Sequence, residues 1–423
     1  MTFSILILVV LFAIGIPIYT AFALGGLSIL LLVVGVPLNQ LASMFFENMN
    51  SFVLLAAPLF ILAGNIMFYG GLGKPMVEFL YRATARLPGG VGVATVIACT
   101  FTGALTGSTI ATMAAVGLIM YPAMVGGQYD KGFSGGIICA ASNLGNLIPP
   151  SLAFIIFGYL TDTSVAGLFM AGVIPGLVLA LLLSITAMII AKKRKFPLTD
   201  NHNRGECKKQ FFQALPAFIM PVIILGGIYG GIFTPTEAAA VACIYGIFVG
   251  VFIFRKMNWR TFWTCLTETT KLIGIVLMLI AGAMFLGKAF TLLGFPQAIS
   301  KWVIEAKLGS HGFLILLVVL FALLGCVMEG LTIMFVTLPL IFPAASALQI
   351  DPMHLGVVFC VSVLMAGMTP PVSIFVYATA GMFKIEIEEL TKGILPFLTI
   401  TFLTLVILTF IPGLSTFLPK LMR

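Results

Sequence analysis

NLIPPS, at residues 146–151, and GMTPPVS, at residues 367–373, each place two adjacent prolines inside a long apolar run. Proline has no backbone N–H and its ring clashes with the carbonyl group four residues earlier, so each pair interrupts a helix. The interruptions free the carbonyl oxygens of Gly145, Asn146, Ala366 and Gly367. Because a free carbonyl is costly in hydrocarbon, such a break survives only where it faces protein, water or a ligand.

The composition of the chain defines its class. Of the 423 residues, 61% are hydrophobic and only 9% are charged, and the apolar runs are long enough to cross a bilayer as helices. We therefore predict an all-α polytopic membrane protein with about 10–12 membrane helices. The net charge of +8 is attributed to membrane topology rather than to nucleic-acid binding. The N-terminus lacks the basic region of a signal peptide, so we expect a retained membrane helix there.

The sequence does not indicate enzyme or metal chemistry. Its seven cysteines and three histidines are scattered without the spacing of a metal site. An HExxH motif and a pair of neighbouring aspartates are both absent. We therefore expect neither an intramembrane enzyme nor a cofactor, and only coupling ions remain as inorganic ligands.

The distribution of basic residues predicts the topology. Seven of the 22 Lys and Arg residues lie in segment 191–209, which we place in the cytoplasm by the positive-inside rule. Continuing from this loop, 17 basic residues fall inside and five outside, provided that residues 91–124 and 311–345 enter the membrane and return without crossing. These two segments are the predicted re-entrant hairpins.

Two further stretches carry local predictions. Residues 1–37 are expected to form two short helices, kinked near Gly15–Pro17 and near Gly25–Gly26. Residues 255–271, RKMNWRTFWTCLTETTK, mix basic and aromatic side chains, so we expect them to lie along the membrane surface. Glu237 follows Thr234–Pro235 and is interpreted as a helix cap rather than as a ligand.

The two proline pairs belong to an internal repeat. A shift of 221 residues places Pro149–Pro150 on Pro370–Pro371 and Asp130 on Asp351. The predicted topology gives the two copies opposite orientations, and inverted repeats with interrupted helices are typical of secondary transporters with a site near the midplane. We divide the chain into N-terminal scaffold helices (1–51), repeat A (52–191), a cytoplasmic loop with central scaffold helices (192–272), and an inverted repeat B (273–423).

The first break and the first hairpin predict an ion site. A half-helix that ends before a proline pair presents carbonyl oxygens, which suit a cation, and the half-helix after it presents N–H groups, which suit an anion. The hairpin tip FTGALTGSTIATM (101–113) adds hydroxyl and carbonyl oxygens, the ligands that hard cations prefer. Packing of helices through small residues is the alternative explanation of its composition. The residues that we expect around one ion are Thr106, Ser108, Thr109, Gly145, Asn146 and Ile148.

The second hairpin, with the tip GCVMEGLTIMF (325–335), carries Glu329 and Thr332, and Thr369 lies beside the second break. Glu329 either attracts a cation or lies in a water-filled vestibule. Because no Arg or Lys lies in either tip or break, an anionic substrate would be held by half-helix N-termini and neutral side chains. The candidate substrate ligands are Ser108, Thr109, Asn143, Asn146, Ser151 and Thr332.

Four segments together resemble the large membrane subunit of tripartite ATP-independent periplasmic (TRAP) transporters, the DctM-like family. They are GALTGSTIATMAAVGLIMYPAM (103–124), YDKGFSGGIICAASNLGNLIPPS (129–151), GGIYGGIFTPTEAAAVACIYG (226–246) and DPMHLGVVFCVSVLMAGMTPPVS (351–373). The resemblance covers nearly the whole chain. It implies an elevator-type sodium symporter of the bacterial inner membrane, which takes up an organic acid anion such as a C4-dicarboxylate or sialic acid. It also implies two partners, a small four-helix membrane subunit and a soluble periplasmic binding protein.

The resemblance also implies sodium ligands. The family's sites correspond here to Thr106, Gly145, Ile148 and Pro150 in repeat A, and to Met328, Gly330, Ala366, Thr369 and Pro371 in repeat B. The second set departs from the family pattern, with Ser362 where Asn is expected, Ala366 where Gly is usual and Glu329 where Asp is frequent. Its side-chain ligands are therefore less well defined than its backbone ligands. The alternative function is a stand-alone ion-coupled anion carrier or channel that needs no binding protein.

Overall fold

The computed structural model describes residues 10–11, 14–197, 204–326, 328–370 and 373–421. All regular secondary structure in these segments is helical. Seven helices are long and apolar enough to cross a membrane, or eight if one pair bent by 70° counts as a single span. The remaining apolar helices have 10–17 residues, because hairpins and breaks divide them. The predicted all-α polytopic class is confirmed.

A bend at Gly15, whose φ is +76°, precedes the helix α2. The elements are α2 (Ile18–Ile29) with a π-turn (Leu30–Val34), α3 (Leu38–Met49), a 3-10 turn (Val53–Leu55), α4 (Ala56–Tyr69) and α5 (Gly73–Ala83). The predicted kink at Gly25–Gly26 is wrong, because α2 runs unbroken through it. A Cβ at Gly26 would lie 2.5 Å from the Leu286 nitrogen, so the glycine allows close packing against another helix instead.

Repeat A continues with a helix pair, an interrupted helix and a long helix. These are α6 (Gly90–Thr106), α7 (Thr109–Gly126), α8 (Lys131–Ser142) with a 3-10 turn (Asn143–Asn146), α9 (Leu152–Thr161) and α10 (Val165–Lys193). The break between α8 and α9 contains the first proline pair, as predicted. The α6–α7 pair has the predicted hairpin form, and its re-entrance stays a prediction because α7 is itself long enough to span.

The central helices are α11 (Arg204–Tyr229), α12 (Pro235–Phe248) with a π-turn (Val249–Ile253), and α13 (Trp259–Leu292). Glu237 forms the predicted cap: its carboxylate accepts from the Thr234 N–H at 2.8 Å, and its own N–H donates to Thr234 Oγ1 at 3.3 Å.

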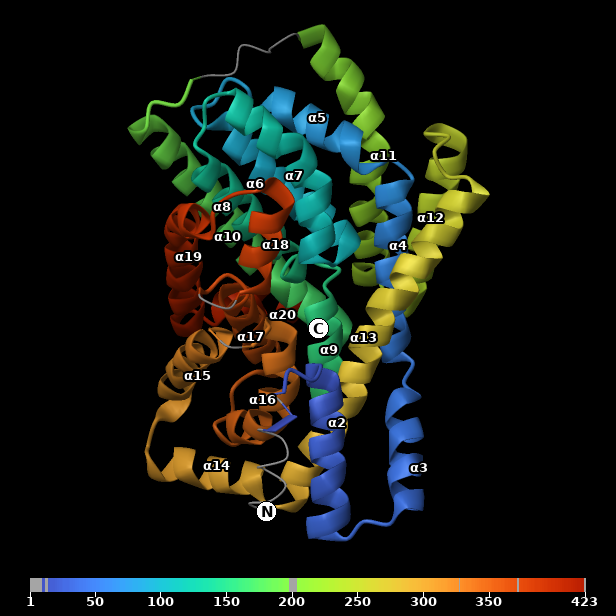
Figure 1. Cartoon of the computed structure of the whole chain (residues 1–423), viewed down its shortest axis with the longest axis vertical. Helices are drawn as coiled ribbons and strands as arrows, with labels where there is room; N and C mark the ends of the chain where they lie inside the picture. The colour runs from blue at the N-terminus through green and yellow to red at the C-terminus, as the bar shows by residue number, and fades with distance from the viewer. Residues whose placement is uncertain (1–9, 12–13, 198–203, 327, 371–372, 422–423) are drawn as a thin grey trace.

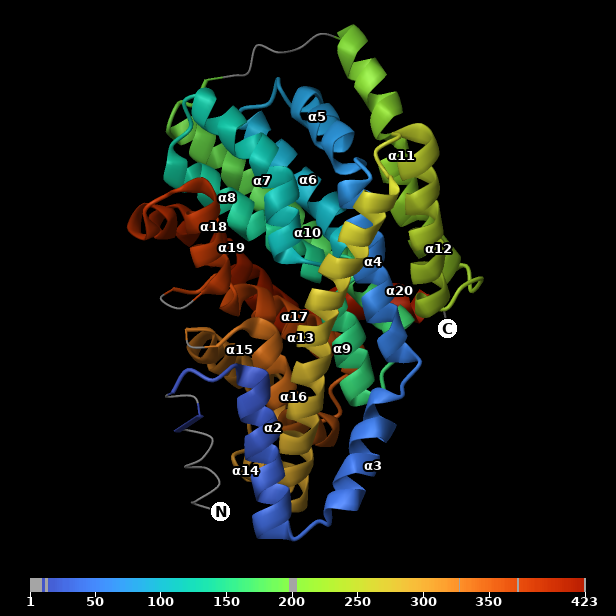
Figure 2. The same ribbon diagram turned by 45° about the vertical axis from the view of Figure 1, so that its right-hand side comes forward.

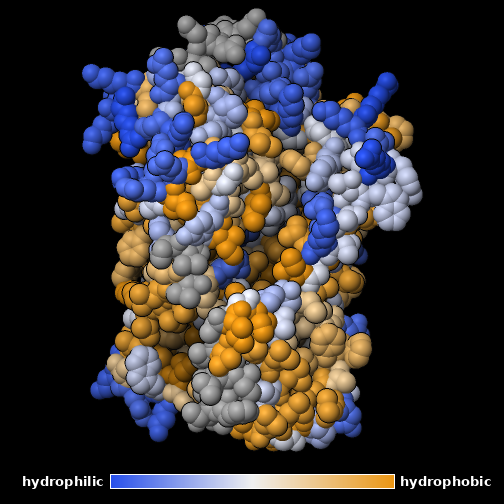
Figure 3. Space-filling model, viewed as in Figure 1, coloured by the Kyte–Doolittle hydropathy of each residue, from blue (hydrophilic) through white to orange (hydrophobic). Residues whose placement is uncertain are grey.

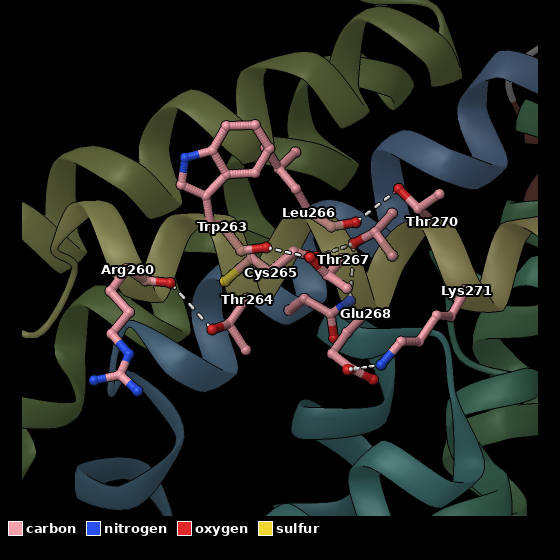
Figure 4. Close-up of polar contacts among 11 residues, drawn as sticks. Arg260, Trp263, Thr264, Cys265, Leu266, Thr267, Glu268, Thr270 and Lys271 are labelled. Carbon is pink, nitrogen blue, oxygen red and sulfur yellow. Dashed lines mark hydrogen bonds and ion pairs between the residues drawn. The ribbon is translucent and has the colours of Figure 1, made fainter.

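The expectation of a separate surface segment at 255–271 is wrong, because Trp259–Leu292 forms one continuous helix of 34 residues. Its threonine hydroxyls donate to carbonyls one turn earlier: Thr264 to Arg260 at 3.0 Å, and Thr267 to Trp263 at 2.8 Å (Figure 4). Because these hydroxyls are hydrogen-bonded within the helix, the polar start of α13 continues into its apolar part without a break.

Repeat B reproduces the order of repeat A. It comprises α14 (Phe295–Glu305), α15 (Gly309–Gly325), α16 (Gly330–Ala347), α17 (Pro352–Ala366), α18 (Ile374–Phe383), α19 (Ile387–Phe410) and α20 (Gly413–Leu421). Helices α7 and α16 both have 18 residues and begin 221 positions apart. The α5 helix lies across one end of the molecule and α14 across the other, as expected for an inverted pair (Figure 1). Helices α2 and α12, each followed by a five-residue π-turn, extend this correspondence into the scaffold.

The two repeats interlock rather than lie side by side as separate bodies. Helix α8 packs on α19 so closely that a Cβ at Gly136 would lie 2.5 Å from the Gly393 carbonyl carbon. In the opposite half, α17 packs on α10, where a Cβ at Gly356 would lie 2.6 Å from a methyl group of Leu168. A second assembly forms from α2 against α13 and from α12 against α4, and the α2–α13 pairing is visible in Figure 2.

The surface has the character of a membrane protein. Hydrophilic side chains gather at the two ends of the long axis, and hydrophobic side chains dominate the band between them (Figure 3). The end that carries the α10–α11 connection is rich in Lys and Arg, so we assign it to the cytoplasm. The long axis therefore runs along the membrane normal.

Candidate functional site

The first break is closed by a serine. Ser151 Oγ donates to the Asn146 carbonyl and accepts from the Phe154 N–H at 3.4 Å, so it caps α9 while holding the loop that contains the prolines. The Pro149–Pro150 peptide bond in this loop is cis. The end of α8 and the start of α9 are thereby held beside each other in the interior.

The first hairpin tip gathers hydroxyl groups. Helix α6 ends at Thr106, the chain turns at Gly107 with φ at +59°, and Ser108 caps α7. Thr106 Oγ1 lies 2.9 Å from Thr112 Oγ1 and 3.3 Å from the Ser108 carbonyl oxygen. Three oxygens therefore converge where the sequence predicted a cation ligand at Thr106. The sequence analysis did not single out Thr112 as a member of this cluster, although it lies six residues after Thr106 and within the tip 101–113.

The tip and the break are in direct contact. A Cβ at Gly103 would lie 2.5 Å from the Cα of Gly145, so only glycines permit this approach of α6 to the first break. Thr109 Oγ1 donates to Asn143 Oδ1 at 3.2 Å, and Asn146 Nδ2 donates to Thr109 Oγ1 at 3.1 Å. Predicted ligands from two distant parts of the sequence are thus brought together.

Two predicted members have more limited roles. The side chain of Ile148 packs on α10, where a Cβ at Gly176 would lie 2.5 Å from its Cγ1, so only its backbone remains as a possible ligand. The Pro150 carbonyl oxygen lies 3.9 Å from the position of a Cβ at Gly107, which places it beside the turn of the tip.

A serine also closes the second break. Ser373 Oγ donates to the Gly367 carbonyl and accepts from the Val376 N–H at 3.2 Å, as Ser151 does in the first half. Thr369 Oγ1 donates to the Met365 carbonyl at 2.8 Å, so this hydroxyl is already hydrogen-bonded to the last turn of α17. Pro371 lies outside the described residues. The sequence analysis did not single out Ser373, although a serine follows both proline pairs.

The second hairpin tip also meets its break. A Cβ at Gly325 would lie 2.5 Å from the Ala366 Cα, which reproduces the approach of Gly103 to Gly145 with one extra methyl group. A Cβ at Gly330 would lie 2.8 Å from the Val363 carbonyl oxygen, so Gly330 also borders α17 closely. Met328 continues the last turn of α15 by donating its N–H to the Leu324 carbonyl at 2.8 Å.

A carboxylate caps the second hairpin. Glu329 accepts from the Thr332 N–H at 3.2 Å and from Thr332 Oγ1 at 3.4 Å, which makes it the N-cap of α16. Ser108, 221 positions earlier, has the same place at the start of α7. Both donors of Thr332 are engaged by this carboxylate, so Thr332 is poorly placed to hold an anion.

The electrostatics of the site are simple. Within the described parts of the two tips and two breaks, Glu329 is the only charged side chain. Groups of three or more His, Cys, Asp or Glu side chains that suit a metal ion do not occur in the part of the chain that the structure describes. The chemistry available is therefore hard-oxygen coordination of a cation and N–H or hydroxyl donation to an anion.

Paired helical hairpins that meet interrupted helices, in two halves of corresponding helix order, are the arrangement of a class of membrane transporters. The YdaH transporter of Alcanivorax borkumensis shares this fold, with a TM-score of 0.67 at 17% identity over 91% of this chain and 90% of that one. Residues 5–414 match the family described as tripartite ATP-independent periplasmic transporter, DctM component. The chain belongs to this family, as its sequence resemblance suggested, and is a large permease subunit in the bacterial inner membrane.

Two relatives illustrate the range of the family. The chain is 38% identical over 396 residues to the C4-dicarboxylate TRAP transporter large permease protein DctM of Pseudomonas aeruginosa, covering 94% of this chain and 92% of that protein. It is 34% identical to the isethionate TRAP transporter permease protein DctMQ of Oleidesulfovibrio alaskensis, covering 96% of this chain and 64% of that protein. Both relatives are named as permeases and neither as an enzyme.

Proposed function

We propose that this permease subunit couples the inward movement of sodium ions to the uptake of a small organic acid anion. The observation that carries the proposal is the meeting of the first hairpin tip with the first break. There the Thr106 hydroxyl, the Ser108 carbonyl and the backbone around Gly145 come together in an apolar interior. Such an arrangement offers a desolvated monovalent cation several neutral oxygens without any ligand of transition-metal type.

The substrate side of the proposal rests on neutral donors. The N-terminus of α9 begins at the buried Ser151, and the amide of Asn146 lies within hydrogen-bonding distance of Thr109. A half-helix N-terminus carries a partial positive charge that favours a carboxylate. The naming of the Pseudomonas relative favours a C4-dicarboxylate, and sugar acids such as sialic acid belong to the same chemical class.

We further propose an elevator movement of one body against another. The moving body would contain both hairpins, both interrupted helices and the long helices α10 and α19 that follow them. Its two halves are joined by the packing of α8 on α19 and of α17 on α10. The scaffold would contain residues 1–51, the arm that precedes the hairpin in each repeat, and residues 210–270. In support, Asn65 Nδ2 of α4 donates to Thr269 Oγ1 of α13 at 2.9 Å and ties the scaffold helices together.

The neighbouring residue on α4 borders the proposed moving body. A Cβ at Gly64 would lie 2.5 Å from the Thr106 Cα, so the first tip rests directly on the scaffold. A glycine at this position provides a smooth surface over which the tip could slide. The division into scaffold and repeats at residues 51, 191 and 272 is part of the same proposal.

The proposed partners are a small four-helix membrane subunit and a soluble periplasmic binding protein that delivers the anion. In support, the Oleidesulfovibrio relative joins M and Q in its name and extends well beyond the matched portion.

Proteoliposome uptake tests the proposal. The large subunit would be reconstituted with its small subunit and cognate binding protein, and uptake of labelled C4-dicarboxylate would be followed under an inward sodium gradient. We expect uptake only with all components and sodium present, and none when potassium replaces sodium. Sodium-independent uptake would refute the coupling, and uptake by the large subunit alone would favour the stand-alone carrier.

A further inference from the structure

A pocket of about 540 Å³ lies at the basic end of the molecule, between α5, α11 and the end of α12. Its apolar walls are formed by Pro75, Phe212, Pro216, Ile253 and Phe254, and Lys209 stands at its edge. None of the residues that line the pocket belongs to either hairpin or either break. The transport chemistry proposed above does not use it.

The pocket opens onto a surface of exposed apolar side chains. Phe212 is 59% exposed and Ile253 is 52% exposed, although both are large apolar side chains. Phe252 and Phe248 continue this exposed apolar surface along α12. Side chains of this kind, exposed in a membrane helix, are suited to contact with acyl chains.

Each of the three chain segments that line the pocket also carries a basic residue. Lys74 precedes Pro75 on α5, Lys209 belongs to α11, and Arg255 and Lys256 directly follow Phe254. Arg255 has a φ of +53° and reverses the chain after the π-turn. The stem of Lys256 packs on the turn between α4 and α5, with its Cδ 2.5 Å from the position of a Cβ at Gly71.

The nearby carboxylates do not neutralise these charges. Glu78 pairs with Lys74 at 3.7 Å, and Glu206 pairs with Arg82. Among the ion pairs found in the described segments, none includes Lys209, Arg255 or Lys256. Lys209, which lines the pocket, and Arg255 and Lys256, which follow its Phe254 wall in the chain, are therefore left without a carboxylate partner in the described segments.

Tryptophans mark the membrane boundary at the same end. Trp259 and Trp263, at the start of α13, are 72% and 53% exposed, and Trp side chains favour the headgroup level of a bilayer. Trp263 and Arg260 project from different sides of α13 (Figure 4). Since the positive-inside rule assigns this end to the cytoplasm, the pocket lies at the headgroup level of the inner leaflet.

We propose that the pocket between α5, α11 and α12 binds an anionic phospholipid of the inner leaflet. Its phosphodiester would lie near Lys209 and the Arg255–Lys256 turn, and its acyl chains would follow Phe212 and Ile253 down the apolar walls. A transmembrane helix of a partner subunit could cover the apolar walls but would leave the unpaired cations unexplained. Charge complementarity therefore favours the lipid.

Native mass spectrometry of the full-length chain, purified and exchanged into defined lipid, tests the site. Phosphatidylglycerol and phosphatidylethanolamine with identical acyl chains would compete for the protein in equal amounts. We expect at least 5-fold preferential retention of phosphatidylglycerol by the wild type, and a ratio near 1 for the Lys209→Ala/Arg255→Ala variant. Lys209→Arg/Arg255→Lys keeps both charges and should retain the preference.

The matched control is Lys301→Ala/Lys307→Ala, which removes two cations from the opposite end and should leave the ratio unchanged. An unaltered preference in the Lys209→Ala/Arg255→Ala variant would overturn the proposal. So would disulfide cross-linking of a Phe212→Cys variant to the small subunit with simultaneous loss of the lipid, because the pocket would then be a protein interface.

Discussion

Replacing Gly103 with alanine probes the contact on which the proposed ion site depends. The added Cβ would lie 2.5 Å from the Gly145 Cα and 2.8 Å from the Gly145 nitrogen. Carbon atoms in contact rest at about 3.5–4.0 Å, so the tip and the break would have to separate by about 1 Å. Both opposing atoms belong to the backbone, and no flexible side chain can relieve the clash.

This separation would disrupt the polar contacts across the interface. The bond from Thr109 to Asn143 is 3.2 Å and that from Asn146 to Thr109 is 3.1 Å, so a further 1 Å, roughly, exceeds hydrogen-bonding range. Overpacking of this kind typically costs about 1–3 kcal/mol. If sodium binding must draw the tip back to the break, the half-saturating sodium concentration should rise about 5- to 150-fold.

The assay is sodium-dependent uptake in proteoliposomes, titrated with sodium at constant ionic strength. Gly274→Ala is the matched control, because Gly274 lies in α13 with no atom within 4 Å of its Cβ position, and it should leave the sodium titration unchanged. A wild-type titration for a folded Gly103→Ala variant would refute the inference that this contact shapes the ion site. An equal shift in both variants would indicate a general effect of helix stiffening instead.

Three further predictions concern individual hydrogen bonds. Thr106→Ala should weaken sodium activation and Thr106→Ser should largely retain it, because the hydroxyl lies 2.9 Å from Thr112 Oγ1; equal activation by both variants would exclude the hydroxyl as a ligand. Ser151→Ala should lower the melting temperature in scanning fluorimetry, since a lost N-cap costs about 1 kcal/mol, and an unchanged transition would argue against the cap. A double-mutant cycle of Asn65→Ala and Thr269→Ala, measured by unfolding in mixed micelles, should give a coupling of about 0.6 kcal/mol; additive effects would count against the scaffold tie.

The sequence predicted the features of the fold that depend on local chemistry. Adjacent prolines must break a helix, so the interruptions at Pro149–Pro150 and after Ala366 could be located without any knowledge of packing. The Thr234–Glu237 capping box is likewise a property of neighbouring residues. The charge distribution predicted that residues 91–124 and 311–345 return without crossing, because only then do the basic residues stay on one side; the paired helices fit this form, and their re-entrance stays a prediction.

Features that depend on distant partners could not be predicted in the same way. Gly25–Gly26 has the composition of a kink, but its use is close packing against α13, which only the fold reveals. The polar start of α13 has the composition of a surface helix, yet its threonines bond within the helix and allow it to continue. Thr112 escaped notice for a related reason, since its importance comes from a rotamer that points at Thr106.

The two halves of the site share a backbone arrangement but differ in charge. The two tips approach their breaks equally closely: a Cβ added at Gly103 would lie 2.5 Å from the Gly145 Cα, and one added at Gly325 would lie 2.5 Å from the Ala366 Cα. The alanine at position 366 therefore does not prevent the close approach of the second tip.

The helix caps are not equivalent. Ser108 leaves the N-terminus of α7 without a charge, whereas Glu329 places a carboxylate at the N-terminus of α16. The Glu329 carboxyl group already accepts hydrogen bonds from Thr332 and occupies the place that an anionic substrate would take. The anion should therefore bind toward the first half, near Ser108 and Ser151, while the second half is better suited to a cation. A single duplicated fold would thus have acquired two different ligand preferences through one change of capping residue.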